Sequence, residues 1–185
     1  MTSTKLYPGM CDDSLEFFYI QEEDRLMAIT EGTVVDYEEL PSSKTQFLDV
    51  LIESEHDVKE ILSSWSECRS EQKRKLAECR FGGLNFTPDF NNGSYVPDSY
   101  DCPHKNSCNG FGVVCKPLVH NGYTLNATDE KAIKLLISSK KNTVIAEELN
   151  MPLGSFEVYR TRLYNSLRIS TKQELASVVF FLGLI

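Results

Sequence analysis

The chain has 185 residues, a length that fits one ordinary domain or two small ones. Its 27 acidic residues exceed its 19 lysines and arginines, and the resulting net charge of −8 excludes a protein that coats nucleic acid over its whole surface. The sequence contains neither an apolar run of about 18 residues nor a basic N-terminus followed by an apolar stretch. We therefore expect a cytoplasmic protein without a membrane span or a secretory signal.

Residues 1–78 are predicted to form an acidic α+β module that begins with a small antiparallel sheet. Short β-rich runs, among them LEFFYI, RLMAI and TVVDY, alternate with turn residues in this part of the chain. Thr30-Glu31-Gly32 is predicted to be a three-residue connection between two strands, with glycine supplying a positive φ.

Two helices are predicted to follow the strands. Pro41 ends the strand region, and a helix is expected over about 42–54. A longer second helix is expected over about 55–78, with Cys68 packed on its apolar stripe. The basic cluster near its end is balanced by neighbouring glutamates, so we predict a solvated surface there rather than a binding site.

Residues 79–117 form a cysteine-rich segment that is poor in aliphatic side chains and rich in Gly, Asn, Pro and Asp. Such a composition buries little apolar surface, so the segment needs a cross-link to fold. In a reducing compartment, clustered cysteines favour metal binding or buried thiols over disulfides. We predict a structural Zn²⁺ site, and its four ligands have the spacing C-x22-C-x5-C-x6-C: Cys79, Cys102, Cys108 and Cys115.

Other interpretations of these cysteines remain open. Spacings of five and six residues together with a Cys-Pro step are also compatible with an iron–sulfur cluster, and His104 can replace one cysteine as a ligand. A third interpretation is a set of four buried or reactive thiols without a metal.

Residues 125–175 are predicted to form amphipathic helices in close succession. Asn126 with Asp129, and Thr171 with Glu174, fit capping boxes, and Asn142 is a candidate cap for the second helix. Asn150, Pro152 and Gly154 mark a sharp turn before the third helix. The apolar positions that define the three buried stripes are Ile133, Leu136, Ile137, Ile145, Ala146, Leu149, Phe156, Leu163 and Leu167.

This region resembles the helix-turn-helix domain of the LuxR family, over about 123–182. The resemblance implies an all-α, four-helix DNA-binding domain over 123–185. Several positions depart from the family pattern: Thr128-Asp129, Ser139, Pro152 and Tyr159. The family's DNA sequence preference therefore does not carry over. The matching positions are Leu125, Asn142, Ile145, Ala146, Leu149, Gly154, Val158, Leu163, Leu167 and Ile169, with Ser155 and Phe156 at the positions of the family's threonine and valine.

Helical geometry predicts which residues of the third helix would meet DNA. With Phe156, Leu163 and Leu167 buried, an outward arc remains for the major groove: Glu157, Val158, Thr161, Arg162 and Asn165. Four further residues are predicted to contact phosphate: Lys140, Lys141, Thr143 and Lys172. The charge of this region is consistent with DNA contact, because residues 121–185 contain eight lysines and arginines against six acidic residues, a net charge of +2.

The sequence therefore predicts an α+β, non-enzymatic, sequence-specific transcription regulator with a structural metal site, whose partner is double-stranded DNA. The alternatives are an adaptor that docks on RNA polymerase or another protein, and an iron–sulfur or redox-sensing regulator. No phosphate-binding loop or catalytic triad is visible. The last helix is more apolar than one buried stripe requires, which favours a homodimer through some of Leu175, Val178, Val179, Phe180, Phe181, Leu182, Leu184 and Ile185.

Overall fold

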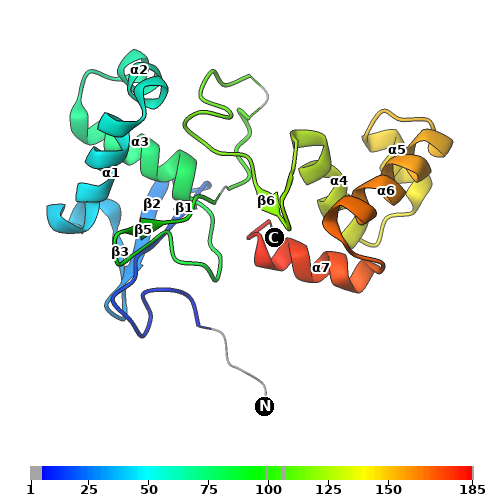
Figure 1. Ribbon diagram of the computed structural model, residues 1–185, viewed down its shortest axis with the longest axis horizontal. Helices are drawn as coiled ribbons and strands as arrows, with labels where there is room; N and C mark the ends of the chain where they lie inside the picture. Colours follow the sequence, from blue (N-terminus) through cyan, green and yellow to red (C-terminus); the bar gives the residue numbers. More distant parts are fainter. Residues whose placement is uncertain (1–5, 99, 106, 185) are drawn as a thin grey trace. The chain divides into compact units, whose positions relative to one another are not determined.

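The computed structural model describes residues 6–98, 100–105 and 107–184 and has a mixed α+β architecture (Figure 1). The chain divides into two compact units, Met1–Lys116 and Pro117–Ile185, so the cysteine-rich segment belongs to the first unit. The predicted α+β class is thereby confirmed. Within the described ranges, the helices are too short or too polar to cross a lipid bilayer.

The first unit contains a three-stranded antiparallel sheet in the order β1-β2-β3. Its strands are β1 (Glu16–Ile20), β2 (Arg25–Thr30) and β3 (Thr33–Asp36). Thr30 pairs directly with Thr33, so the connection between β2 and β3 has two residues and the predicted length of three is wrong. Glu31 and Gly32 both have positive φ, 51° and 76°, the geometry that matches the twist of a two-residue hairpin.

Helices follow the sheet in the order η1 (Tyr37–Glu39), α1 (Ser42–Ser54), α2 (His56–Trp65) and α3 (Arg69–Phe81). The single helix predicted over 55–78 is wrong, because the chain is extended at Ser66 and Cys68. The Ser66 hydroxyl accepts the Cys68 N–H at 3.0 Å, a local bond that competes with helix continuation. Cys68 is therefore exposed at the start of α3 and does not pack in the core.

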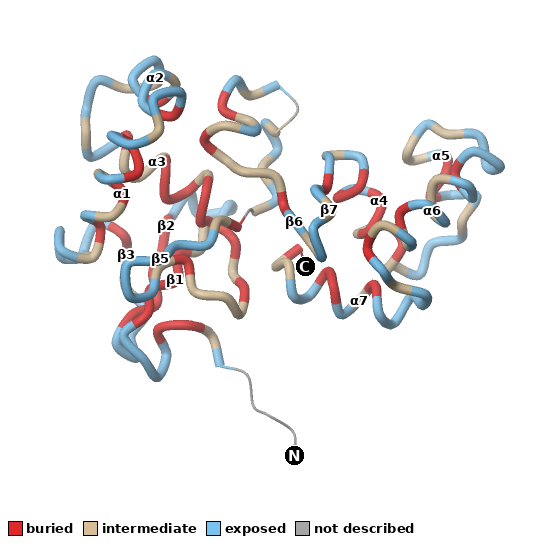
Figure 2. The backbone as a smooth tube through the Cα atoms, viewed as in Figure 1, coloured by how far each residue is buried: buried red, intermediate tan, exposed pale blue. Residues whose placement is uncertain are grey.

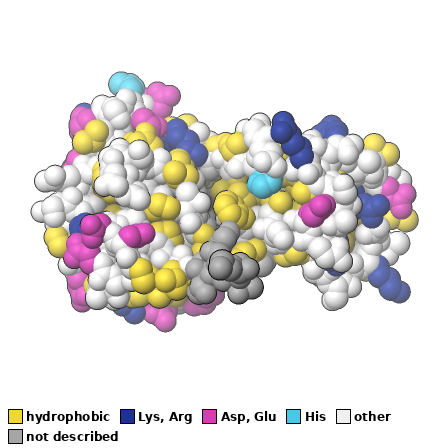
Figure 3. Space-filling view, turned by 60° about the horizontal axis from the view of Figure 1, so that its bottom comes forward, with side chains coloured by type: hydrophobic (Ala, Val, Ile, Leu, Met, Phe, Trp, Pro, Cys, Tyr) yellow, Lys and Arg dark blue, Asp and Glu magenta, His cyan; other side chains and the backbone are white. Residues whose placement is uncertain are grey.

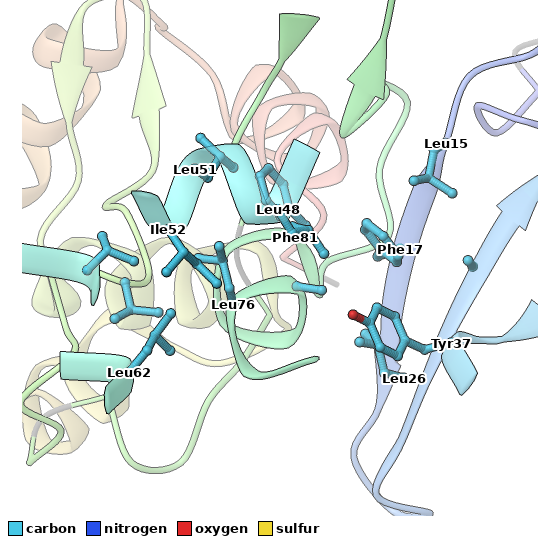
Figure 4. Packing of buried hydrophobic residues seen from close by; sticks show 14 residues of the cluster. Leu15, Phe17, Leu26, Tyr37, Leu48, Leu51, Ile52, Leu62, Leu76 and Phe81 are labelled. Atoms are coloured by element: carbon cyan, nitrogen blue, oxygen red, sulfur yellow. The ribbon is translucent and has the colours of Figure 1, made fainter. Parts of the chain in front are cut away.

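The core of the first unit lies between the sheet and these helices (Figure 4). Helix residues such as Leu48, Ile52 and Leu76 face strand residues such as Phe17 and Leu26. Alternation along β1 directs every second side chain into this core, as expected for a strand with one covered face.

The outer edge of β1 is covered by a later segment of the chain. The N–H of Leu15 donates to the carbonyl of Phe90 at 2.9 Å, and the N–H of Tyr19 donates to that of Gly82 at 2.9 Å. Between them, the N–H of Phe17 donates to the Asp89 carboxylate at 2.6 Å. These bonds close an edge that would otherwise be free to pair with another strand. The covering segment continues into a short hairpin, β4 (Phe90–Asn91) and β5 (Ser94–Tyr95).

The second unit begins with a hairpin and continues with four helices that enclose one apolar core. Its elements are β6 (Val119–His120), β7 (Tyr123–Thr124), α4 (Ala127–Ile137), α5 (Asn142–Glu148), α6 (Leu153–Leu167) and α7 (Lys172–Phe181). Both predicted capping boxes are formed, at the starts of α4 and α7. Buried and exposed stretches alternate along α4 and α7, as expected of amphipathic helices (Figure 2).

A tight turn joins α5 to α6. Asn150 has a φ of 55°, and the Met151 N–H donates to the Ala146 carbonyl at 2.8 Å, the pattern of a Schellman helix end. Pro152 then precedes the first residue of α6. Asn142 is the first residue of α5 and makes no capping bond, so the predicted cap at that position is wrong.

Candidate functional site

The outward arc predicted on α6 lies on the solvent side of the helix. Glu157, Val158, Thr161, Arg162 and Asn165 are all exposed, and Val158 keeps 72% of its surface. Together with Gly154 they line a shallow depression along the helix. The opposite face of α6, formed by Phe156, Leu163 and Leu167, is buried in the core. The helix therefore presents these five side chains on a rigid support.

The first turn of α6 leaves backbone donors open to solvent. No side chain caps this helix, because Pro152 stands at the capping position. A Cβ added at Gly154 would meet no atom within 4 Å. The depression is thus open at the end where the positive pole of the helix dipole lies.

The four predicted phosphate contacts differ in their environments. Lys140 pairs with Glu148 at 2.7 Å, and Lys172 donates to the Ser138 carbonyl at the end of α4. Lys141 and Thr143 are exposed at the start of α5. Among the described residues, Lys141 has no ion-pair partner. Of the three lysines, Lys141 is therefore the one most accessible to a ligand.

Basic and acidic side chains are interspersed on the second unit. Figure 3 shows lysine and arginine side chains spread singly over its drawn face, with acidic side chains between some of them. Glu157 lies within the arc itself, and Glu148 neutralises Lys140. The surface therefore differs from a continuous basic face.

Asp129 connects α6 to the rest of its unit. Its buried carboxylate accepts the Tyr159 hydroxyl at 2.6 Å and the Tyr123 hydroxyl at 2.9 Å, in addition to the N–H of Asn126 in the capping box. Burial, and then this hydrogen bond to Asp129, raise the pKa of Tyr159, so the phenol stays protonated and remains a donor. This network holds α6 against α4 and β7.

The four clustered cysteines are half-buried in the first unit. Burial raises the pKa of Cys115, and the neighbouring thiols of Cys108 and Cys102 raise it further. Burial also raises the pKa of Cys79, with smaller contributions from Glu78 and Cys115. The charges of these thiols therefore act on one another. The Gly110 N–H donates to the sulfur of Cys108 at 3.3 Å.

The described geometry does not close the thiols around a tetrahedral centre. Four sulfurs at about 2.3 Å from one zinc ion would be separated by roughly 4 Å. Within the described residues, no three of the cysteine sulfurs lie within 4.8 Å of one another. His104 is exposed, and its carbonyl accepts the Cys108 N–H at 2.9 Å.

Arg80 fixes the last part of the cysteine-rich segment. This fully buried guanidinium donates to the carbonyls of Val114 at 2.8 Å and Val113 at 2.7 Å. It also forms an ion pair with Glu55, which Lys116 approaches at 3.0 Å. The chain around Cys115 is thereby attached to α3 and to the start of α2.

Trp65 provides a second attachment for the same segment. Its indole N–H donates to the Asn109 side chain at 2.9 Å. A Cβ at Gly110 would lie 2.5 Å from the indole ring, so only glycine allows this approach.

A third cluster was not predicted from the sequence. Glu16, Asp89 and Asp98 are buried together, and one oxygen of each lies within 4.8 Å of the others. Burial raises the pKa of Glu16 to about 9, with a contribution from Asp98, and burial raises the pKa of Asp98 to about 8. Burial followed by the charges of Asp98 and Glu16 raises the pKa of Asp89 as well. The available signal was the glutamate inside the apolar run LEFFYI.

No family model, curated protein or solved structure matches the chain. The resemblance to the LuxR family thus stays a prediction from the residues of the second unit.

Proposed function

We propose that the protein is a transcription regulator that binds duplex DNA through α5 and α6. The observation that carries this proposal is the exposed arc of α6, which projects from a helix whose other face is wholly buried and which follows a tight turn after α5. A helix supported in this way fits the major groove, where base edges differ in their donors and acceptors.

The side chains of the arc have complementary partners on base edges. Arg162 can donate two hydrogen bonds to guanine, and Glu157 can accept one from the amino group of cytosine. Val158 and the methyl group of Thr161 match a thymine methyl group, while Asn165 suits adenine. Phosphate would be contacted by Lys141, Thr143 and the open N–H groups at the start of α6. To contact phosphate as well, Lys140 and Lys172 would have to exchange their present partners.

The test is a selection of bound sequences from random duplex DNA by the full chain, followed by affinity measurements at several salt concentrations. Arg162→Ala should weaken binding to the selected sequence by roughly 5- to 150-fold and have less effect on random DNA. Lys141→Ala should weaken binding to all sequences alike and reduce the salt dependence. Lys59→Ala, which removes one cation from the other unit, is the charge-matched control.

Gly154→Glu tests the position of the interface without disturbing the core, because Gly154 is exposed and a Cβ at this position would meet no atom within 4 Å. A carboxylate at the open start of α6 would repel phosphate, so DNA affinity should fall. The Tm should not fall, because glutamate forms helices better than glycine and its charge suits the first turn of a helix. Selection that enriches no sequence, or equal binding by Gly154→Glu and the unaltered chain, contradicts the proposal.

The second candidate function is an adaptor that docks on RNA polymerase or another protein. The exposure of Val158 in the middle of the arc and the Lys140–Glu148 pair favour it, because a protein interface tolerates mixed charge and needs apolar contacts. For an adaptor, RNA polymerase should copurify with the unaltered chain and not with Val158→Asp. The chain should then show no DNA binding.

We further propose that the regulator forms a homodimer through α7. Leu175, Val178 and Val179 are buried in the unit's own core, whereas Phe180 and Phe181 are 51% and 46% exposed. Ile185, also named in the predicted interface, lies outside the described residues. Paired recognition helices would read two half-sites about one helical turn apart. Sedimentation should show a dimer that Phe180→Ser weakens, and a monomer both free and on DNA would contradict it.

The cysteine cluster is proposed to hold a structural Zn²⁺ ion on Cys79, Cys102, Cys108 and Cys115. The four half-buried thiols in one unit and the N–H bond to the sulfur of Cys108 suit this donor set. A bound cation would also favour the thiolate form that burial opposes. An iron–sulfur cluster that senses redox state is the alternative with the same ligands.

Elemental analysis of anaerobically purified protein separates these two possibilities. The zinc protein should be colourless and contain about one zinc ion per chain, and Cys108→Ser should change the fluorescence of Trp65, which contacts Asn109 and Gly110. A brown protein that bleaches in air would identify the iron–sulfur cluster. Absence of both metals after expression with both available rejects the site.

A further inference from the structure

The buried carboxyl groups of Glu16, Asp89 and Asp98 come from three parts of the first unit. Glu16 opens β1, Asp89 precedes β4, and Asp98 follows β5. Their exposed fractions are 0%, 0% and 4%. The oxygens that lie within 4.8 Å of one another are thus enclosed by protein.

Backbone donors hold each carboxyl group in position. Glu16 Oε1 accepts the N–H of Asn85 at 2.8 Å, and Asp98 Oδ1 accepts the N–H of Gly83 at 3.1 Å. Asp89 Oδ2 accepts the N–H of Phe17 at 2.6 Å. Such bonds favour the ionised form of a carboxyl group and orient it. The cluster is therefore a built arrangement rather than a set of adjacent flexible side chains.

Two of the buried oxygens have no hydrogen-bond partner among the described residues. Glu16 Oε2 and Asp89 Oδ1 accept no hydrogen bond of normal geometry. Within the described ranges, neither Lys, Arg nor His forms an ion pair with any of the three carboxyl groups. Buried polar atoms are almost always satisfied, and a buried charge without a counter-charge is strongly unfavourable. Either protons or a cation must compensate this site.

We propose that Glu16, Asp89 and Asp98 bind one oxygen-preferring divalent cation, with Ca²⁺ as the best match. Three carboxylates and no sulfur or nitrogen donor form a hard ligand set, which distinguishes this site from the cysteine cluster. Mg²⁺ usually keeps several of its waters, whereas Ca²⁺ accepts many protein oxygens in flexible geometry. Because the cluster is enclosed, it has little access to water, and this favours Ca²⁺.

The cation would fasten the segment that covers the edge of β1. Glu16 belongs to the sheet, while Asp89 and Asp98 belong to the segment that bonds to Leu15, Phe17 and Tyr19. A shared ion would replace mutual repulsion between the carboxylates with attraction to a common charge. Its role is structural, and it is independent of the proposed DNA binding.

The experiment measures the Tm and the bound metal of the full chain at constant zinc, so that the cysteine ligands stay in the same state. CaCl₂, MgCl₂ and MnCl₂ are added in separate titrations at pH 7.5. The expected result is about one Ca²⁺ per chain and a Tm raised by roughly 5–10 °C at a hundredfold excess over the Kd. Weaker responses are expected for Mg²⁺ and Mn²⁺.

Asp89→Asn keeps the shape of the side chain and an acceptor for the Phe17 N–H but removes the charge. This variant should fold and lose the response to all three cations, whereas Asp13→Asn, at an exposed carboxylate, should respond like the unaltered chain. Absence of any cation response at millimolar concentration would overturn the proposal and identify a cluster neutralised by protons. Equal responses in Asp89→Asn would also overturn it, because the ion would then bind elsewhere.

Discussion

The two units of the molecule are stabilised by contacts of different range. In the second unit, Asn126 caps α4 through Asp129 and Thr171 caps α7 through Glu174, so these bonds join residues three positions apart. In the first unit, Arg80 binds the carbonyl of Val114 and Asp89 binds the N–H of Phe17. The helix starts of the second unit are therefore fixed by near neighbours, although Tyr159 also bonds to Asp129 thirty positions earlier, whereas the first unit depends mainly on distant residues meeting.

The units also differ in the groups that compensate their buried charged side chains. The second unit contains the buried Asp129, whose carboxylate receives two phenols and a backbone N–H. The first unit buries Arg80 in an ion pair and also buries three adjacent carboxyl groups that form no ion pair with a described lysine, arginine or histidine. We therefore expect pH, metal ions and substitutions of buried polar groups to change the stability of the first unit more than that of the second.

The largest effect is expected from Arg80→Met. This change removes the donor to two buried carbonyls and leaves Glu55 without its main partner, which should lower the free energy of unfolding of the first unit by about 3–5 kcal/mol. Denaturant unfolding followed by the fluorescence of Trp65, the single tryptophan, measures it. Arg25→Met, in an exposed ion-pair network, is the control and should leave the midpoint unchanged. Equal midpoints for both variants would contradict the assigned role.

Leu163→Ala should affect the second unit alone. Its side chain is 1% exposed in the core of the four helices, so its truncation should cost about 2–5 kcal/mol. Amide hydrogen exchange in α4 and α6 should accelerate, while the unfolding midpoint reported by Trp65 fluorescence should stay the same. Val158→Ala on the outer side of the same helix should change stability by less than about 0.5 kcal/mol. A shifted Trp65 transition would show that the units do not unfold independently.

Without added divalent cations, the first unit should lose stability as the pH rises. The folded-state pKa values of Glu16 and Asp98, about 9 and about 8, exceed those of unfolded carboxyl groups, so the folded state binds more protons between about pH 4 and pH 9. The contribution of these groups to the free energy of unfolding is then largest near pH 4. As the pH rises, it falls by up to about 1.4 kcal/mol per pH unit for each protonated group. Thermal unfolding across this range measures the slope.

Glu16→Gln is the matched variant for this pH dependence. The amide cannot ionise, and its oxygen can still accept the N–H of Asn85, so the slope should decrease. Glu60→Gln, at an exposed position on α2, should keep the original slope. A pH profile that is the same in both variants would assign the effect to other groups.

The smallest effect is expected from Thr171→Ala at the start of α7. The hydroxyl accepts the Glu174 N–H at 3.1 Å, and loss of such a cap typically costs about 1 kcal/mol. Chemical denaturation of the second unit measures the change. Ser177→Ala, in the interior of the same helix, is the control and should alter stability by less than about 0.5 kcal/mol.

Prediction from sequence succeeded where periodicity and capping decide the structure. The stripe of Phe156, Leu163 and Leu167 is buried, and both capping boxes are present. It failed at Ser66, where a hydroxyl bonded to the Cys68 N–H interrupts an otherwise helical pattern. It also failed at the hairpin after Thr30, where the two-residue loop follows from strand register rather than from composition.

For the candidate sites, the sequence predicted the residues of the α6 arc because one helix carries all of them at known angular positions. It grouped the four cysteines by residue type alone. It missed the cluster of Glu16, Asp89 and Asp98, because carboxylates are common and the three lie far apart along the chain. Its one visible sign was a glutamate in an apolar strand.

The sequence by itself determined the acidic N-terminal part and the slightly basic C-terminal third, the helices of the second unit and the exposed face of α6, because charge, periodicity and capping act between near neighbours. Only the tertiary structure decided that Arg80 closes the cysteine-rich segment, that the segment around Asp89 covers the edge of β1, and that three carboxyl groups share one enclosed space. Those arrangements depend on which distant groups satisfy one another's hydrogen bonds and charges after the chain has folded, and no local pattern encodes that choice.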